Sequence, residues 1–333
     1  MSTPQHVIFT TMKNEGPFML EWVAHNLSLG FDGLIIYTND CVDGTDLIAC
    51  RLDELGLASH VPNPVKPGGN PQHQMLRRAR KHPMVLQANW LMCLDADEFI
   101  NVTAGARTIQ SLIEASGTPD AISLAWRLFG CGGVEVYADA PVTQQFTLCD
   151  HPTDHASGRA YGLKTLFRNN GSFGRFGPHR PKDISEDRLP NLRWCDGGGK
   201  LYSAADVGWR AWPGFNHSLG RIHHYAVRSV ESFMVKRDRG RTNHIHVDQA
   251  ESYWRDMNIN RVEDHSIRAL ADRARPVLDG LMGDQVLGRL HREACDWHRS
   301  RVAELRARED WAKFRGWLLK NKIATLPQTV KKK

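Results

Sequence analysis

Two aspartates separated by one residue, Asp95 and Asp97, are the residues whose type and spacing most directly suggest chemistry. They directly follow the apolar run 90–94, which has the character of a buried strand. Two carboxylates placed in this way can present oxygens to one hard divalent cation. Mg²⁺ or Mn²⁺ prefers such ligands and keeps coordination sites for diphosphate oxygens and water. The alternative is a helix N-cap followed by an acidic first turn.

Two further polar clusters also follow predicted strands. Asn14 and Glu15 come after the apolar run 7–12, and the polar turn 39–44 comes after the run 33–37. In a parallel sheet, ligands bind outside the carboxyl ends of the strands. The three clusters are therefore expected to converge on one edge of the sheet, which favours the metal site over the helix cap.

The elements that must position these residues alternate regularly over the first 100 residues. The predicted strands are separated by segments whose apolar residues recur at helical spacing. Pro17 suits the first turn of one such helix, and Gly30 and Gly56 are expected to end helices. The predicted strands are 7–12, 33–37, 59–62 and 90–94, and the predicted helices are 17–29, 45–55 and a basic segment broken near Pro83. This order predicts an α/β fold with a mostly parallel sheet flanked by helices. Residues past 248 are predicted to be helical to the end of the chain.

The motifs together resemble glycosyltransferase family 2, in its bacterial branch with a Lys-Asn-Glu motif and an Asp-x-Asp-Glu-Phe motif, which is similar to the glycosyltransferase 92 family. The resemblance covers roughly residues 6–260. Its motifs are Thr11-Met12-Lys13-Asn14-Glu15, Glu21-Trp22, Asn39-Asp40-x-x-Asp43-Gly44-Thr45, Leu94-Asp95-Ala96-Asp97-Glu98-Phe99, Trp126-x-x-Phe129-Gly130, Lys164-x-x-Phe167-Arg168, His179-Arg180-Pro181-Lys182 and His224-Tyr225-x-x-x-Ser229-x-x-x-Phe233-x-x-Lys236-x-x-x-Gly240.

The resemblance implies a GT-A fold, a nucleotide-sugar donor and a divalent metal that bridges the Asp-x-Asp motif to the donor diphosphate. It implies that Asp97 is the main metal ligand, that Asp95 reaches the ribose or the metal, and that His224 completes the metal shell. His223 departs from the residue expected before that histidine, so either of the two could be the ligand. The residues implied for the base and ribose pocket are Asn14, Glu15, Asn39, Asp40 and Asp43.

Three cations follow a predicted helix that begins at Ser229. Lys236, Arg239 and Arg241 lie close in sequence to His224, which makes contact with the donor diphosphate a reasonable expectation. Such cations would stabilise the charge that develops on a departing nucleoside diphosphate. The alternative is that they only complement the dipole at the helix C-terminus.

A carboxylate that could serve as general base is harder to find. An inverting transfer needs a group that takes the proton from the acceptor hydroxyl, and the Glu-Asp pair of the wider family is missing at the expected place. Asp183, next to the motif 179–182, is the first candidate, and Glu186 and Asp206 are others. Each of them could also be an ordinary surface carboxylate.

Charge is distributed unevenly along the chain of 333 residues. Residues 281–333 carry a net charge of +7, whereas residues 1–280 carry −1. A near-neutral body argues against nucleic acid as a partner. The basic C-terminal segment, with Trp311, Phe314, Trp317 and Leu318, could lie on an anionic membrane or could pack on the body. The expected domains are a glycosyltransferase domain over 1–245, with a nucleotide-binding half (1–100) and an acceptor half (101–245), and a helical extension over 246–333.

The cysteines and the N-terminus predict a cytoplasmic protein, and the membrane alternative for the C-terminal segment would make it peripheral at the inner face of the membrane. The seven cysteines are scattered and form no Cys-x-x-Cys pair, and no signal-peptide pattern is visible at residues 1–6. No apolar run approaches the roughly 20 residues that span a bilayer.

The functional hypothesis is therefore a metal-dependent, inverting transfer of a sugar from a nucleotide-sugar, such as a UDP-sugar, to a glycan or lipid-linked acceptor. One alternative is a nucleotidyltransferase, but the segment 10–15 lacks the Gly-rich phosphate loop that such an enzyme needs. The other alternative is a non-catalytic module that binds sugar nucleotides or glycans, which the combination of Asp95, Asp97 and His224 disfavours.

Overall fold

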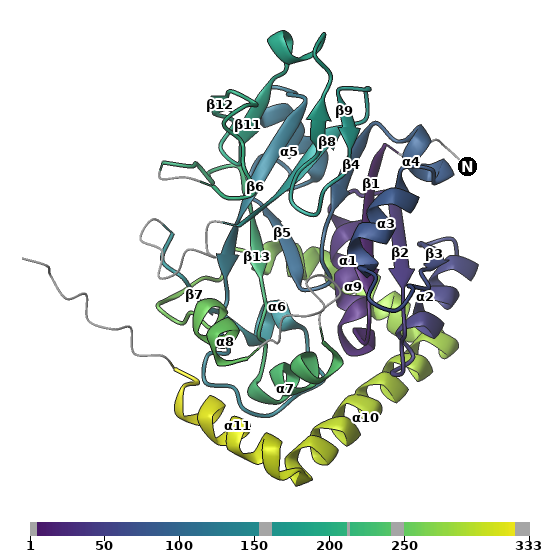
Figure 1. Ribbon diagram of the computed structural model, residues 1–333, viewed down its shortest axis with the longest axis vertical. Coiled ribbons are helices and arrows are strands. Elements are labelled where there is room, and N and C mark those ends of the chain that lie inside the picture. The colour runs from purple at the N-terminus through teal and green to yellow at the C-terminus, as the bar shows by residue number, and fades with distance from the viewer. Residues whose placement is uncertain (1–4, 153–161, 212–213, 241–249, 324–333) are drawn as a thin grey trace, which may run out of the picture.

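The computed structural model describes residues 5–152, 162–211, 214–240 and 250–323. A large twisted sheet runs through the molecule, with helices on both of its faces, and a pair of long C-terminal helices forms one border (Figure 1).

The first part of the chain builds four parallel strands. β1 (His6–Met12) lies between β2 (Gly33–Thr38) and β4 (Trp90–Cys93), and β3 (Ser59–Pro62) pairs with β2. The connecting helices are α1 (Gly16–Ser28), α2 (Thr45–Glu54), α3 (Pro71–Ala79) and α4 (Pro83–Gln87). Because these strands are parallel and neighbouring, the segments that follow β1, β2 and β4 emerge at the same edge of the sheet.

Both faces of this sheet are covered, and the strands are accordingly apolar throughout. Ile8 and Met92 belong to a core on one face with α1 and α2, whereas Val7, Phe9 and Leu91 belong to a core on the other face with α3. Successive side chains of a strand point to opposite faces. A strand buried on both sides must therefore read as a continuous apolar run.

The middle of the chain extends the same sheet. β8 (Leu163–Arg168) pairs antiparallel with both β4 and β6 (Ala121–Leu128), and β11 (Trp194–Asp196) and β12 (Leu201–Tyr202) follow at the edge. β13 (Gly220–His224) pairs with β6 and with β5 (Glu98–Val102). The smaller elements are α5 (Ile109–Ala115), α6 (Val142–Gln145), β7 (Leu148–Cys149), β9 (Phe173–Arg175), β10 (Lys182–Ile184) and the 3-10 helix Leu189–Asn191.

The C-terminal part is almost entirely helical. It comprises α7 (Val230–Arg239), α8 (Glu251–Met257), the short β14 (Val262–Glu263), α9 (Arg268–Gly283), α10 (Gln285–Ala307) and α11 (Glu309–Lys320). α9 and α10 pack against α1, and α11 packs against α7. Trp311, Phe314 and Leu318 of α11 are buried in a cluster with side chains of α7. Of the two alternatives for this segment, packing on the body is the one observed for these three residues.

The predicted fold class is confirmed. The molecule is a mixed α/β fold with a mainly parallel central sheet flanked by helices, in agreement with the GT-A-like arrangement expected, and the extension is helical. The sequence did not predict β8, the antiparallel strand inserted between β4 and β6. All seven cysteines are free thiols, and no helix of the described residues is long and apolar enough to cross a membrane.

Candidate active site at the strand ends

A cavity of about 650 Å³, which we call the strand-end cavity, opens at the edge where β1 and β4 end. Three carboxylates line it together with five lysine and arginine side chains, so its lining carries an excess of positive charge. The charged residues of the lining are Glu15, Asp95, Asp97, Lys164, Arg180, Lys182, Lys236 and Arg239.

Asp97 is paired with a lysine and a histidine. Its Oδ2 lies 2.5 Å from Nζ of Lys236 and 3.5 Å from Nε2 of His224, and its side chain is only 10% exposed. Burial would raise the pKa of Asp97, but the charges of Lys236 and His224 hold it well below its ordinary value. Asp97 is therefore an anion throughout the physiological pH range, as a metal ligand must be.

Asp95 is held by a different set of partners. Its two carboxylate oxygens accept hydrogen bonds from Gln72 at 3.1 Å and from the fully buried ammonium of Lys164 at 2.9 Å. The same Lys164 lies 3.4 Å from Glu98, and Glu98 accepts a hydrogen bond from the backbone N–H of Asp95 at 2.9 Å. Burial raises the pKa of Glu98 to about 7 despite Lys164. Lys164 thus ties the turn after β4 to the neighbouring antiparallel strand β8.

Glu15 is clamped by two arginines. Its carboxylate oxygens lie 2.9 Å from Arg228 and 2.5 Å from Arg239, and the Arg228 guanidinium sits 3.6 Å from the centre of the Phe18 ring. Burial would raise the pKa of Glu15, but Arg239 and Arg228 lower it. Arg239 therefore joins the end of α7 to the turn after β1, and both belong to the wall of the cavity.

Strand and helix geometry explain which of the predicted residues reach the cavity. In β13, His223 and His224 point to opposite faces, as successive strand residues must. His224 lines the cavity, whereas His223 is fully buried beside Asn101, and burial lowers the pKa of His223 to about 3. In α7, Lys236 and Arg239 are three residues apart and share one helix face.

The other residues predicted for the nucleotide pocket are not among those that line the cavity. Asp43 accepts hydrogen bonds from the backbone N–H groups of Gly16 and Thr45, and Asn14 accepts one from Val42. They shape the turns after β1 and β2. Asn39 donates to the Asp40 carboxylate, while the buried Oδ1 of Asn39 has no hydrogen-bond partner among the described residues.

Asn14 and Asp40 also adopt the left-handed backbone region, with φ of 50° and 47°. Asn and Asp tolerate this region better than other residues with a side chain. The polar residue types at these two positions therefore have a conformational reason that is separate from any contact with a nucleotide.

The candidate bases lie outside the lining of the cavity. Asp183 is 56% exposed and forms an ion pair with Arg175, in which Arg175 donates a hydrogen bond at 2.9 Å. This hydrogen bond lowers the pKa of Asp183. Glu186 and Asp206 are exposed as well. Arg241, the third predicted cation, lies outside the described residues.

Several residues of the cavity were missed as functional candidates. Lys164 and His179 occur in motifs of the resemblance, but nothing in their sequence context indicated a role. His179 lies between Trp126 and Trp209, at 5.6 Å from each ring, and its Nδ1 is 2.9 Å from the carbonyl oxygen of Leu163. Burial, together with the charge of Lys164, lowers the pKa of His179 to about 4, so the imidazole is neutral at pH 7.

The side chains of the cavity fit a divalent cation in part. Asp97 and His224 place a carboxylate oxygen and an imidazole nitrogen 3.5 Å apart, a separation that two ligands of one ion can have. Asp95 is directed to Lys164 and Gln72 instead. Within the described ranges, three ligand atoms gather within 4.8 Å of one another only at Asp139, His291 and Cys295. Asp97 and His224 could therefore supply two protein ligands, and bound diphosphate and water could supply the others.

Comparisons with known proteins find similarity among solved structures. No family model matches the chain, and no curated protein matches it. Among solved structures, residues 1–349 of S. aureus TarS in complex with UDP match at 11% identity and a TM-score of 0.32, over 49% of this chain and 46% of that chain.

Two further crystal structures of the same protein also match. S. aureus TarS matches at 11% identity and a TM-score of 0.31, over 49% of this chain and 28% of that one. TarS 1–349 matches at 10% identity and a TM-score of 0.32, over 96% and 81%. In the first two comparisons the match spans less than half of the TarS chain.

Proposed function

We propose that the protein is a metal-dependent glycosyltransferase that uses a nucleotide-sugar donor, in the first place a UDP-sugar. The observation that carries this proposal is the strand-end cavity itself. It combines an ionised, buried Asp97, an adjacent His224 and the cations Lys236 and Arg239 at the edge where ligands of parallel sheets bind.

The donor diphosphate would be bound by the cations of the cavity. Lys236 and Arg239 extend from α7, and Lys182 and Arg180 line the wall as well. Preorganised cations of this kind lower the barrier because the leaving nucleoside diphosphate gains negative charge as the bond to the sugar breaks. Thr11 lines the cavity, and its buried Oγ1, which has no hydrogen-bond partner among the described residues, would be available to the nucleoside.

A divalent cation, Mn²⁺ or Mg²⁺, would be held by Asp97 and His224. When bound, it would neutralise charge on the donor diphosphate as a Lewis acid. Lys236 now lies against the same carboxylate oxygen of Asp97 as His224 does. Lys236 would therefore have to share Asp97 with the cation or turn toward the diphosphate.

The acceptor hydroxyl would enter beside the aromatic side of the cavity, where Trp126, Trp209 and Tyr253 offer flat surfaces for a sugar ring. Asp183 stays a candidate base for an inverting transfer, although it would have to leave Arg175 to act. A peripheral membrane contact of the C-terminal helix also stays a prediction. With Trp311, Phe314 and Leu318 buried, it would depend on exposed cations such as Lys313.

A screen of nucleotide-sugars for Mn²⁺-dependent release of nucleoside diphosphate tests the proposal. We expect Asp97→Asn to lower the release by about a hundredfold, because the variant loses the anion of the cavity that is closest to His224 and Lys236. Asp310→Asn, on the exposed side of α11, is the matched control and is expected to keep full activity. Asp183→Asn in the same assay tests the assignment of the base.

Two results would contradict the proposal. One is an Asp97→Asn variant with wild-type activity, which would remove the proposed site. The other is a wild-type protein that binds no nucleoside diphosphate, with or without Mn²⁺, in a thermal-shift measurement. That second result would favour the alternative of a non-catalytic glycan-binding module.

A further inference from the structure

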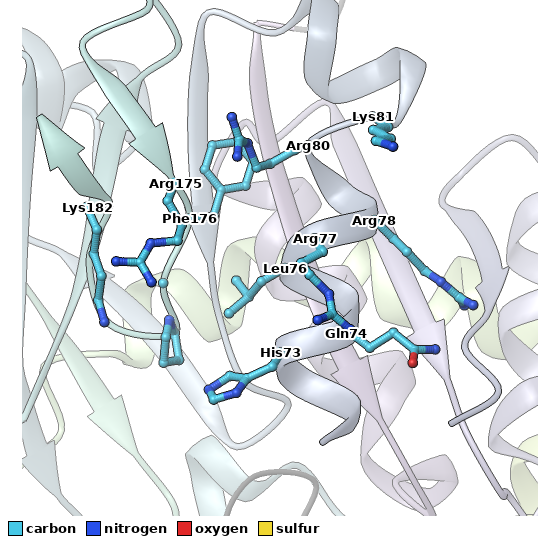
Figure 2. Close-up of a pocket in the computed structure, with 12 residues that line it drawn as sticks. His73, Gln74, Leu76, Arg77, Arg78, Arg80, Lys81, Arg175, Phe176 and Lys182 are labelled. Carbon is cyan, nitrogen blue, oxygen red and sulfur yellow. The ribbon is translucent and has the colours of Figure 1, made fainter. Parts of the chain in front are cut away.

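A second, larger hollow adjoins the strand-end cavity. It has a volume of about 1070 Å³ and lies between α3 and the hairpin formed by β9 and β10 (Figure 2). We call it the basic groove. His73, Pro178 and Lys182 line both hollows, so the two meet at these residues. A ligand that occupies the strand-end cavity can therefore continue into the groove.

The lining of the basic groove contains six lysine and arginine side chains and no carboxylate. These cations are Arg77, Arg78, Arg80, Lys81, Arg175 and Lys182. Arg175 is paired with Asp183, and Arg78 donates to the Pro62 carbonyl and to Asn63. In the part of the chain that the structure describes, no ion pair joins Arg77, Arg80 or Lys182 to a carboxylate, but Lys182 and Arg80 lie near enough to Asp183 to lower its pKa together with Arg175.

Some of these cations lie on the side of α3 that faces the groove, because of their helical spacing. His73 and Arg77 are four residues apart on one face of α3, and Arg80, the C-cap residue directly after the helix, follows Arg77 at an interval of three. Figure 2 shows Arg80 extending toward Phe176 next to the hairpin, whereas Arg78 of α3 and Lys81, just past the end of that helix, lie on the side away from the hairpin. Arg175 and Lys182 face the groove from the hairpin.

The floor of the groove is apolar. Leu76 and Phe176 line it, and Phe176 is stacked on Phe9 of β1 with ring centres 5.3 Å apart. An apolar floor between two rows of cations suits a chain of sugar rings that carries negative groups along its edges. Unlike a flat exposed patch, a hollow between a helix and a hairpin is poorly shaped for the plane of a membrane.

We propose that the basic groove binds the anionic part of the glycan acceptor, a chain of sugars that bears carboxylate or phosphate groups. This inference rests on the proposed function, because it takes the adjoining cavity as the place of sugar transfer. Opposite charges across such an interface increase the rate of association and discriminate against neutral partners. The groove would thus select acidic over neutral glycans and hold the end of the chain toward the cavity.

Direct binding of defined probes tests the groove without any knowledge of the natural acceptor. The full-length protein is titrated with a fluorescent oligogalacturonate and, separately, with a maltooligosaccharide of the same length as the neutral probe. We expect the Arg77→Glu/Arg80→Glu variant to bind oligogalacturonate at least about tenfold more weakly, because attraction becomes repulsion at two positions. Added salt should weaken binding to the wild type by screening the same charges.

Control variants separate a loss of binding from a loss of folding. Arg77 and Arg80 are exposed, so both the double variant and the milder Arg77→Gln/Arg80→Gln should keep the wild-type melting temperature. The milder variant should show an intermediate loss of binding. Lys313→Glu, which changes the net charge in the same direction on α11, should bind oligogalacturonate within about twofold of the wild type.

Two further binding measurements identify which chemical group supplies the negative charge of the ligand. Binding of tripolyphosphate that depends on Arg77 and Arg80, without binding of oligogalacturonate, would support a phosphate-bearing glycan. Vesicles of phosphatidylglycerol that bind in an Arg77- and Arg80-dependent manner, while oligogalacturonate does not, would overturn the proposal in favour of a membrane surface. Equal binding of oligogalacturonate to the wild type and the Arg77→Glu/Arg80→Glu variant would overturn it as well.

Binding of UDP with Mn²⁺ is measured on the same variants. It should be unchanged by Arg77→Glu/Arg80→Glu, and a loss would assign the groove to the donor and overturn the proposal. If the wild type binds oligogalacturonate through Arg77 and Arg80 but no nucleoside diphosphate, the proposed function fails while the groove remains an anionic-glycan site. The two failures are therefore distinguishable.

Discussion

At the scale of single residues, each carboxylate of the strand-end cavity has a cation within hydrogen-bonding distance. Glu15 has Arg228 and Arg239, Asp95 has Lys164, and Asp97 has Lys236. A buried charge without a partner is costly, whereas one that is paired and hydrogen-bonded persists. These pairs keep the side chains of the cavity charged and ordered.

A pair outside the cavity makes the stability of the protein depend on pH. His291 of α10 lies 2.9 Å from the Asp139 carboxylate and 3.5 Å from the thiol of Cys295. Burial alone would lower the pKa of His291, but Asp139 and Cys295 raise it to about 9. Because the folded state holds this proton more tightly than the unfolded state, the stabilisation is complete below about pH 6.5 and is lost as the pH rises toward 9.

We expect the free energy of unfolding to fall by about 1 kcal/mol between pH 6.5 and pH 9, a modest amount because Asp139 is partly exposed to solvent. His291→Gln should remove this part of the pH dependence in urea titrations. His265→Gln, at an exposed histidine, should leave the pH profile as it is. A His291→Gln profile parallel to that of the wild type would show that the pair contributes nothing.

At the scale of elements, α7 connects the site with the C-terminal helices. One face of α7 carries Lys236 and Arg239 into the cavity, while Phe233 and Met234 belong to the cluster that also buries α11. Arg237 of α7 covers the Phe314 ring at 4.0 Å. The aromatic residues of α11 therefore support the helix that bears two of the cations proposed to bind diphosphate.

This packing predicts a clear effect of substitutions in α11. Phe314→Ala should lower the free energy of unfolding by about 3 kcal/mol, because it removes a buried aromatic side chain and leaves a void. Lys313→Ala, with a side chain that is 82% exposed, should change it by less than about 0.5 kcal/mol. Denaturant titrations measure both, and a Phe314→Ala variant as stable as the wild type would mean that the apolar face is not buried in solution.

At the scale of the whole molecule, the described helices of the extension share an apolar core with the rest of the chain. The principal apolar cluster contains Ile8 and Met92 of the sheet, Leu20 of α1, Leu270 of α9 and Leu287 of α10. The boundary expected near residue 245 therefore separates a region of mixed strands from a helical one, but the apolar core continues across it. The domain division itself stays a prediction.

A shared core predicts that the chain unfolds as one unit. Calorimetry and tryptophan fluorescence should report the same single transition. A chain that ends at Gly283 should lose that transition, because it leaves the surfaces that α10 covers exposed to water. Arg289→Ala, at an exposed position of α10, should melt within a few degrees of the wild type. A shortened chain that melts like the full one would establish the extension as separable.

The sequence by itself determined the order and type of the elements in the first 100 residues and the edge where the polar clusters gather. Continuous apolar runs with helical spacing between them admit few arrangements other than a parallel sheet covered on both faces. The alternation of side chains along a strand does not tell which of His223 and His224 faces the cavity. The answer depends on the registers of β13 with β5 and β6.

Only the tertiary structure decided which charged groups meet. Lys164 reaches Asp95 across 69 positions of sequence, and Lys236 reaches Asp97 across 139. The basic groove likewise needs α3 and the β9–β10 hairpin to face each other. Local sequence encodes secondary structure through nearby spacing, whereas ion pairs and hollows depend on distances between elements that the packing of the whole chain sets. The sequence therefore located the edge of the site, and the fold determined how its charges are paired.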